Sequence, residues 1–255
     1  MKMRNIEIIC VLIRTILSPI KYAKFIHQYN IFKQESKKKN RFSLNWWRQY
    51  PFLFEATEET FFDHHYVYHP AWAARVIQKI NPDCHVDISS TLQFCSMISA
   101  FLPVKFYDYR PANLSLSNLT SNHADLTELP FDDNSIQSLS CMHTIEHIGL
   151  GRYGDKIDPD GDLKAINELK RVLSNNGDLL FVVPIGTEAK ILFNAQRIYS
   201  YEQISTYFSE FELVEFSLIT DNPEIGDFIR NADPNLTKKC TNGCGCFWFK
   251  KIPAA

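Results

Sequence analysis

The chain has 255 residues, of which 45% are apolar, 22% charged and 13% aromatic. This composition is typical of a globular protein with a sizeable core, and it excludes a disordered or collagen-like chain. A chain of this length forms one large domain, or a core with an extension. The net charge of −2 hides an uneven distribution of charge along the chain.

Residues 1–41 form a strongly basic arm. They hold ten of the 27 lysines and arginines but two of the 29 acidic residues, so the arm carries +8 and the rest of the chain −10. A basic helix with apolar residues can lie along an anionic membrane surface. The alternative is a helix that packs on protein, followed by a solvated lysine run. Because the rest of the chain is acidic, we do not expect nucleic acid as a partner. The apolar residues of the arm are Ile8, Ile9, Leu12, Ile13, Ile16, Leu17 and Ile20.

The apolar stretch of the arm, residues 6–17, is interrupted by Glu7 and Arg14. A membrane-spanning helix needs about 18 to 20 uninterrupted apolar residues, so we do not expect a span here. The same charges, and the lack of a small-residue cleavage site, make the stretch a poor secretory signal. We therefore expect a cytoplasmic protein that can meet the membrane surface. Its seven cysteines, an odd number, predict free thiols rather than a disulfide framework.

The hydrophobic pattern divides the chain into a basic and aromatic helical extension, residues 1–62, and a domain of alternating helices and strands, residues 63–255. Strands separated by helices indicate βαβ units and a doubly wound α/β sheet, whose ligand site lies at the carboxyl ends of the strands. Helices are predicted at 70–80, with Pro70 in the first turn, and at 91–101, 162–173 and 200–208. Strands are predicted at 85–88, 104–107, 136–142, 179–183, 211–219 and 247–252.

Two aspartates lie at the ends of expected strands, and a third precedes a turn, in a pattern that suits a nucleoside cofactor. Asp87 ends the first strand, and Asp108 ends the second strand 21 residues later. An acid after the second strand can accept the ribose hydroxyls. Asp125, next to Leu126, can accept a hydrogen bond from an exocyclic amine. For each acid taken singly, the alternative is a loop or capping residue.

Several segments together resemble class I S-adenosylmethionine-dependent methyltransferases. The most specific segments are 123–136, 141–147, 165–173 and 182–184. More narrowly, the chain resembles a branch of that superfamily catalogued as a domain of unknown function, DUF268. The segments that carry this second resemblance are 65–75, 85–90, 146–155 and 245–247. The resemblance covers about residues 63–252 and leaves the basic arm outside.

The resemblance implies a seven-stranded, mostly parallel sheet, S-adenosylmethionine as cofactor, and methyl transfer to an oxygen or nitrogen of a small molecule or glycan. Asp87 would lie near the methionine part of the cofactor and Asp108 on the ribose. Asp125 and Leu126 would contact the adenine. Met142 and His143, which end the fourth strand, would line the methyl-transfer side.

One departure from the family concerns the turn after the first strand, which is glycine-rich in most members. Here Ser89 and Ser90 occupy that turn. Their Cβ atoms leave less room for a ligand and make a positive-φ turn costly. The hydroxyls could instead bind the methionine carboxylate or cap the next helix. The alternative function is therefore a non-catalytic interaction module that has lost cofactor binding. A nicotinamide oxidoreductase is disfavoured because no glycine-rich fingerprint follows a strand.

His143, Glu146 and His147 follow the fourth strand and are the candidate catalytic residues. If the acceptor is a hydroxyl, a base must take its proton, and histidine suits this role near neutral pH. We expect His147 or His143 as the base and Glu146 as its orienting partner. The alternative is that His143 packs under the cofactor and His147 caps the next segment.

Two patterns compete with this interpretation. Residues 143–147 also match the H-x-x-E-H zinc pattern of a metalloprotease class, which needs both histidines on one helical face. A strand runs into the motif, and Gly149 and Gly151 follow it, so such a helix is not expected. Cys240, Cys244 and Cys246 could ligate zinc, but no second cysteine pair exists, and a tight turn with buried thiols is favoured. The sequence therefore predicts no metal.

Overall fold

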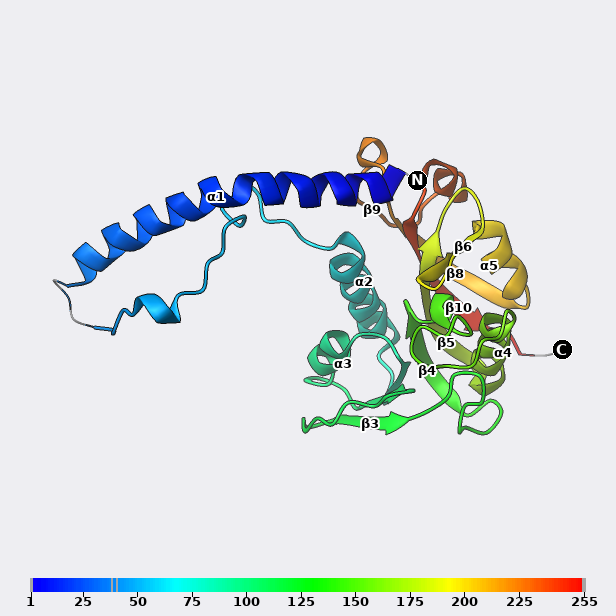
Figure 1. Ribbon diagram of the computed structural model, residues 1–255. Helices are drawn as coiled ribbons and strands as arrows, with labels where there is room; N and C mark the ends of the chain where they lie inside the picture. The colour runs from blue at the N-terminus through cyan, green and yellow to red at the C-terminus, as the bar shows by residue number, and fades with distance from the viewer. Residues whose placement is uncertain (1, 38, 40, 254–255) are drawn as a thin grey trace. The chain divides into compact units, whose positions relative to one another are not determined.

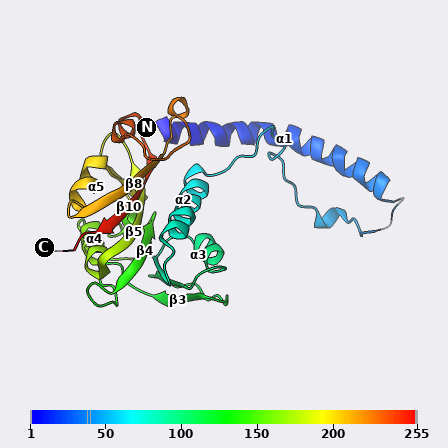
Figure 2. The same cartoon turned by 180° about the vertical axis from the view of Figure 1, so that it is seen from behind.

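The computed structural model describes residues 2–37, 39 and 41–253, with side chains described from residue 16 onward (Figures 1 and 2). The chain divides into two compact units, Met1–Phe62 and Asp63–Ala255. Each unit is described by itself.

The first unit contains α1 (Lys2–Ser36) and a 3-10 helix, η1 (Trp46–Arg48). The N-terminal helix that the sequence predicts is therefore present. Trp46 packs edge-on against Tyr29 of α1, with ring centroids 4.9 Å apart. Ile16 and Ile20 expose 70% and 68% of their surface. The side chains of Ile8, Ile9, Cys10, Leu12 and Ile13 lie outside the described residues. Within the described chain, no helix is both long and apolar enough to span a bilayer.

The second unit is built on an eight-stranded sheet of order β3-β2-β1-β4-β5-β10-β8-β9. The strands from β3 to β5 are parallel, and β10 is antiparallel to both of its neighbours. This confirms the doubly wound, mostly parallel α/β fold, with the two-residue β9 added to seven longer strands. The strands are β1 (His85–Ile88), β2 (Val104–Asp108), β3 (Leu119–His123), β4 (Ile136–Met142), β5 (Leu173–Ile185), β8 (Phe211–Ile219), β9 (Phe228–Ile229) and β10 (Gly243–Lys251).

Helices cover both faces of this sheet (Figures 1 and 2). On one face lie α2 (His64–Ile80) and α3 (Leu92–Ile98), and on the other α4 (Gly161–Val172) and α5 (Tyr201–Tyr207). The remaining elements are the hairpin β6 (Lys190–Leu192) and β7 (Gln196–Ile198) and the 3-10 helices η2 (Ile145–His147), η3 (Pro223–Ile225) and η4 (Pro234–Lys239).

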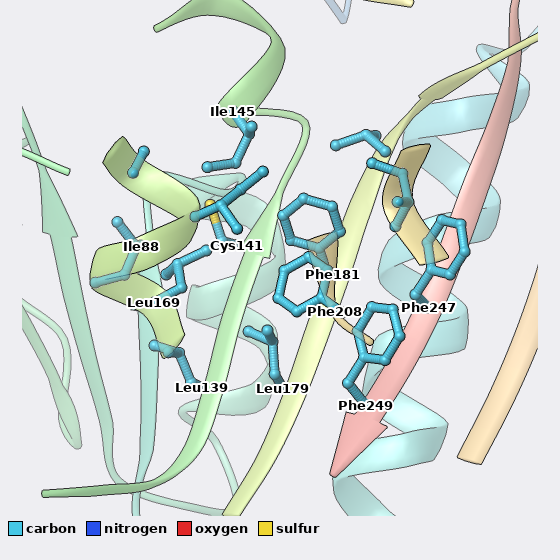
Figure 3. Close-up of a cluster of buried hydrophobic side chains, with 14 of the residues drawn as sticks. Ile88, Leu139, Cys141, Ile145, Leu169, Leu179, Phe181, Phe208, Phe247 and Phe249 are labelled. Carbon is cyan, nitrogen blue, oxygen red and sulfur yellow. The ribbon is translucent and has the colours of Figure 1, made fainter. Parts of the chain in front are cut away.

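The apolar run of β5 shows why the sheet is buried on both faces. Successive strand residues point to opposite faces, so Leu179, Phe181 and Val183 join the core under α4 and α5, and Leu180 and Val182 join the core under α2 and α3. Figure 3 shows Phe181 among the aromatic rings of the first core. There Phe208 stacks on Phe249 with centroids 4.6 Å apart.

Most predicted elements are present, and the differences lie at their ends. Helix α2 begins at residue 64 because Asp63 caps it by accepting the Tyr66 N–H at 3.2 Å, so Pro70 lies inside the helix and not in its first turn. Helix α3 ends at residue 98, earlier than predicted. Strand β10 begins at residue 243, earlier than predicted. Strand β3 was not predicted, because its residues 120–123 are polar and partly or fully exposed at the sheet edge.

Candidate functional site

A cavity of about 500 Å³ opens at the carboxyl ends of β1, β2 and β4. In the sheet, β1 lies between β2 and β4, so the chain leaves it in one direction and later returns on the other side. This switch point is where doubly wound sheets bind ligands. Of the predicted site residues, the structure brings seven to this cavity: Ser89, Ser90, Asp108, Met142, His143, Glu146 and His147.

A second cavity of about 210 Å³ adjoins the first and contains Asp125 and Leu126. The two cavities share lining residues, which are Ser89, Tyr109, His147, Ile148 and Tyr153. The predicted residues therefore surround one continuous depression, with a single exception. Asp87 is fully buried below it and lines neither cavity.

Asp87 is the end of a buried chain of hydrogen bonds between β1 and β4. Its carboxylate accepts from the Ser140 hydroxyl and, at 3.0 Å, from the Ser90 N–H. Because Ser140 donates to Asp87, it accepts from His85 Nε2 at 2.8 Å, and His85 Nδ1 then accepts from Ser138 at 2.7 Å. Burial raises the pKa of Asp87 to about 6 and lowers that of His85 to about 3.

The turn after β1 has the conformation that glycine usually provides. Ser89 has φ of 56°, in the left-handed region, and its N–H donates to the Tyr107 carbonyl at 2.7 Å. Ser90 Oγ accepts the Met142 N–H at 3.1 Å, which ties the turn to the end of β4. Thr91 caps α3 by accepting the Phe94 N–H. The serine hydroxyls therefore hold the turn itself.

Asp108 and Asp125 lie on the surface of the depression, and each orients its carboxylate through the following backbone. Asp108 Oδ1 accepts the Arg110 N–H at 2.7 Å. Asp125 Oδ1 accepts from both the backbone and the hydroxyl of Thr127 at 2.8 and 2.7 Å. Leu126 beside it is 4% exposed. Both acids are thus turn residues, as the alternative interpretation proposed, and they also line the cavities.

His143 and Glu146 form a buried pair at the end of β4. His143 Nδ1 lies 2.8 Å from Glu146 Oε1, and the two side chains are 6% and 1% exposed. A carboxylate accepts hydrogen bonds, so Nδ1 donates. Like Ser89, His143 has a left-handed backbone, with φ of 55°. Its ring stacks on His65 and Tyr66 from α2, at 5.2 and 5.4 Å between centroids.

His147 is oriented by the hairpin loop between β6 and β7. Its Nδ1 lies 2.7 Å from the Ala195 carbonyl, to which it must donate, so Nε2 keeps the lone pair of the neutral ring. Arg152 donates to the same carbonyl at 2.9 Å. Burial lowers the pKa of His147, against Glu146 and the Ala195 carbonyl, which raise it. His147 is therefore a neutral acceptor near pH 7.

As expected from the sequence, the H-x-x-E-H residues form no shared helix, and the three cysteines of residues 240–246 are buried. His143 precedes a single 3-10 turn, Ile145–His147, so the H-x-x-E-H residues do not share a helical face. Cys240 packs in the core under α4 and α5, whereas Cys244 and Cys246 pack in the core under α2 and α3. All six cysteines that the structure describes are free thiols.

Sequence reasoning missed several residues of the site. Tyr109 and Arg110 directly follow Asp108, and that adjacency was a usable signal. Tyr66 comes from the first turn of α2 and lines the same cavity, which no local pattern indicates. His65 also lines it, and the cluster of His64, His65 and His69 in the sequence favours packing or substrate-cleft residues there. The loop after His147 is held in place, because Asp155 accepts the N–H groups of Gly149, Gly151 and Tyr153.

The strained turn predicts opposite effects for two neighbouring serines. Ser89→Gly removes the left-handed strain and should raise the free energy of unfolding by about 1 kcal/mol. Ser90→Gly removes the acceptor of the Met142 N–H and should lower it by about 1–2 kcal/mol. Urea unfolding of both variants measures this. A larger loss of stability in Ser89→Gly than in Ser90→Gly would contradict the assignment.

The raised pKa of Asp87 predicts a pH dependence. Between about pH 4 and pH 6 the folded state holds a proton that the unfolded state has released, so this contribution to stability is present at low pH and is lost as pH rises through 6. Asp87→Asn stays neutral throughout. Its stability relative to the native protein should therefore improve by about 3 kcal/mol from pH 4 to pH 7. Urea unfolding at pH 4 and pH 7 measures this. If the difference in unfolding free energy between Asp87→Asn and the native protein does not change with pH, the pKa of Asp87 is not raised.

Comparison with known proteins agrees with this architecture. Residues 105–228 match the family described as "Caenorhabditis protein of unknown function, DUF268". Uncharacterized protein MJ0638 of Methanocaldococcus jannaschii is 29% identical over 102 residues, which are 39% of this chain and 38% of that protein. The chain thus spans about two fifths of the curated relative it matches.

A solved structure shows the same fold at low sequence identity. A 1,6-didemethyltoxoflavin-N1-methyltransferase of Burkholderia thailandensis, solved with S-adenosylhomocysteine, is 9% identical with a TM-score of 0.51, over 73% of this chain and 79% of that chain. A methyltransferase of Aquifex aeolicus is 13% identical with a TM-score of 0.41, over 70% and 89%. The chain has the class I methyltransferase fold, and its residues 105–228 match the DUF268 family model.

Proposed function

We propose that this protein transfers a methyl group from S-adenosylmethionine to an oxygen or nitrogen atom of a small molecule or glycan. The observation that carries the proposal is the continuous depression at the switch point, in which Asp108 lies at the end of β2 and Asp125 and Leu126 lie beyond β3. An acid for the ribose and a polar and apolar pair for the adenine are the groups that an adenosyl cofactor requires there.

The donor set fits this cofactor. One carboxylate oxygen of Asp108 accepts the Arg110 N–H, which orients the carboxylate. Its second oxygen would accept hydrogen bonds from the ribose hydroxyls. Leu126 offers an apolar surface next to the exposed carboxylate of Asp125. The cavity volume of about 500 Å³ falls within the range of about 300–1,000 Å³ that is typical of small-molecule sites. Ser89, which lines both cavities, carries a Cβ where a glycine turn would have none.

Methyl transfer requires mainly that the acceptor atom be held in line with the methyl group. The cofactor supplies an already activated methyl group when it is bound, and holding the acceptor in line can lower the barrier by about 7–11 kcal/mol. In this chain His147 would receive the acceptor's proton at Nε2, since Nδ1 is held by the Ala195 carbonyl. Glu146 lies 3.8 Å from that nitrogen and would stabilise the protonated ring.

The acceptor would bind in the part of the cavity that His147 and Arg152 line. Arg152 lines this region and keeps its guanidinium beside His147. A planar cation of this kind recognises carboxylate or phosphate groups. We therefore include an anionic group in the proposed acceptor, which a sugar phosphate or an acidic small molecule would provide.

Cofactor binding is the first test. S-adenosylmethionine should bind the native chain with a micromolar Kd in calorimetry. Asp108→Ala should weaken it about 10- to 100-fold through loss of hydrogen bonds to a charged group. Asp83→Ala, an exposed acid before β1 at the opposite edge of the sheet, is the matched control and should not change the Kd. If calorimetry detects no binding of S-adenosylmethionine to the native chain, the alternative function is favoured. That alternative is a non-catalytic interaction module, and it was suggested by the Ser89–Ser90 turn.

The role of His147 predicts a selective kinetic effect. His147→Ala should lower the release of S-adenosylhomocysteine about 10²- to 10⁴-fold with a hydroxyl acceptor, and leave the Kd of the cofactor within threefold. His64→Asn, a more exposed histidine at the start of α2, should keep the native rate. Near-normal turnover in the His147 variant would remove this residue from catalysis.

We also propose that residues 1–41 contact an anionic membrane surface. The exposed Ile16 and Ile20 lie one helical turn apart in α1, near Lys21 and Lys24. The double variant Ile16→Ser, Ile20→Ser should lower binding to phosphatidylserine vesicles at least about tenfold, because serine has little apolar surface to bury in the membrane interface. Ile252→Ser is the control. Unchanged partitioning of the double variant would end the membrane proposal.

A further inference from the structure

Three metal-ligating side chains from distant parts of the second unit meet at the wall of the larger cavity, which His65 and His143 line. His65 comes from the first turn of α2, His143 follows β4, and Cys244 belongs to β10. One ligand atom of each lies within 4.8 Å of the others. Around a tetrahedral zinc ion, nitrogen and sulfur ligands are about 3.3–3.6 Å apart. Side-chain rotations that move these atoms by about 1 Å would therefore close the set.

His143 is oriented as a metal ligand is. Its Nδ1 donates to Glu146 Oε1, whereas its Nε2 is buried and has no hydrogen-bond partner within the described chain. Metal-binding histidines characteristically donate their other ring N–H to a carboxylate or a backbone carbonyl, which fixes the tautomer and directs the lone pair. Because only 6% of this side chain is exposed, an unpartnered nitrogen is costly there.

His69 shows the same arrangement one helical turn after His65. Its Nδ1 donates to the His65 carbonyl at 2.6 Å, and its Nε2 is also without a hydrogen-bond partner among the residues described. The His69 side chain is fully buried, and its ring contacts that of His143 with centroids 5.1 Å apart. Buried polar atoms are nearly always satisfied, so the unpartnered Nε2 of His143 calls for a ligand. His69 packs beside this set but does not belong to the group whose ligand atoms lie within 4.8 Å of one another.

We propose that His65, His143 and Cys244 bind one divalent metal ion of the zinc class, with Glu146 orienting His143. Two imidazoles with a thiolate favour zinc over magnesium or calcium, which take oxygen ligands. The ion would join α2 to β4 and β10 and place a positive charge at the wall of the acceptor cavity. No sequence motif indicates this site, because successive ligands are 78 and 101 residues apart along the chain.

The test uses the full chain after removal of metal by chelation, with cobalt(II) and zinc as probes. We expect one equivalent of cobalt to bind with a thiolate-to-metal absorption band. Cys244→Ser should abolish this band, and His143→Asn should weaken zinc binding at least 100-fold. Cys84→Ser and His64→Asn are matched controls outside the cluster and should bind as the native chain does.

Glu146→Gln keeps an oxygen that accepts a hydrogen bond from His143 but removes the negative charge. This variant therefore tests the site without removing a ligand or leaving an empty space in the core. It should weaken zinc binding about 10- to 100-fold. Circular dichroism of each metal-free variant verifies its fold. The proposal is wrong if the native chain binds no stoichiometric zinc at micromolar concentration, or if Cys244→Ser, His143→Asn and Glu146→Gln, folded as the native chain, bind zinc with native affinity. This readout does not depend on cofactor binding or on turnover.

Discussion

The buried carboxylate of Asp87 is the contact on which the candidate site depends. It lies at the carboxyl end of β1, where the Ser90 N–H and the Ser140 hydroxyl hold it. Through Ser140 it continues to His85, so β1 and β4 are joined side chain to side chain across the switch point as well as by their backbones. Hydrogen-bonded chains of this kind strengthen one another in a low-dielectric interior. The position of the Ser89–Ser90 turn, and with it the floor of the cavity, follows from this chain.

Backbone strain gathers at the same edge of the sheet. Ser89 and His143 end the neighbouring strands β1 and β4, and both have left-handed backbones. For residues with a Cβ this costs about 1–2 kcal/mol each. Ser89 is held there by the Tyr107 carbonyl, and His143 by the Val182 carbonyl and Glu146. Strain that the surroundings maintain is typical of functional sites, because it fixes side chains where a ligand needs them.

Much of this fold follows from local pattern. Periodicity places β1, β4 and β8 at their observed residues, and the capping box of Ser200 and Gln203 starts α5 as expected. The parts that sequence reasoning missed depend on tertiary contacts. β3 is polar and forms because it pairs with β2 at the edge. The meeting of His65, His143 and Cys244 could not be read from spacing, because packing of α2 on the sheet creates it.

The proposed methyl transfer requires an adenosyl group bound above the Ser89–Ser90 turn. A crystal structure of the full chain with S-adenosylhomocysteine tests this most directly. We expect the ribose hydroxyls within hydrogen-bond distance of Asp108, and the adenine between Leu126 and Ile148, which both line the smaller cavity. A ligand elsewhere on the molecule, or none at millimolar concentration with the cavity open to solvent, would contradict the account.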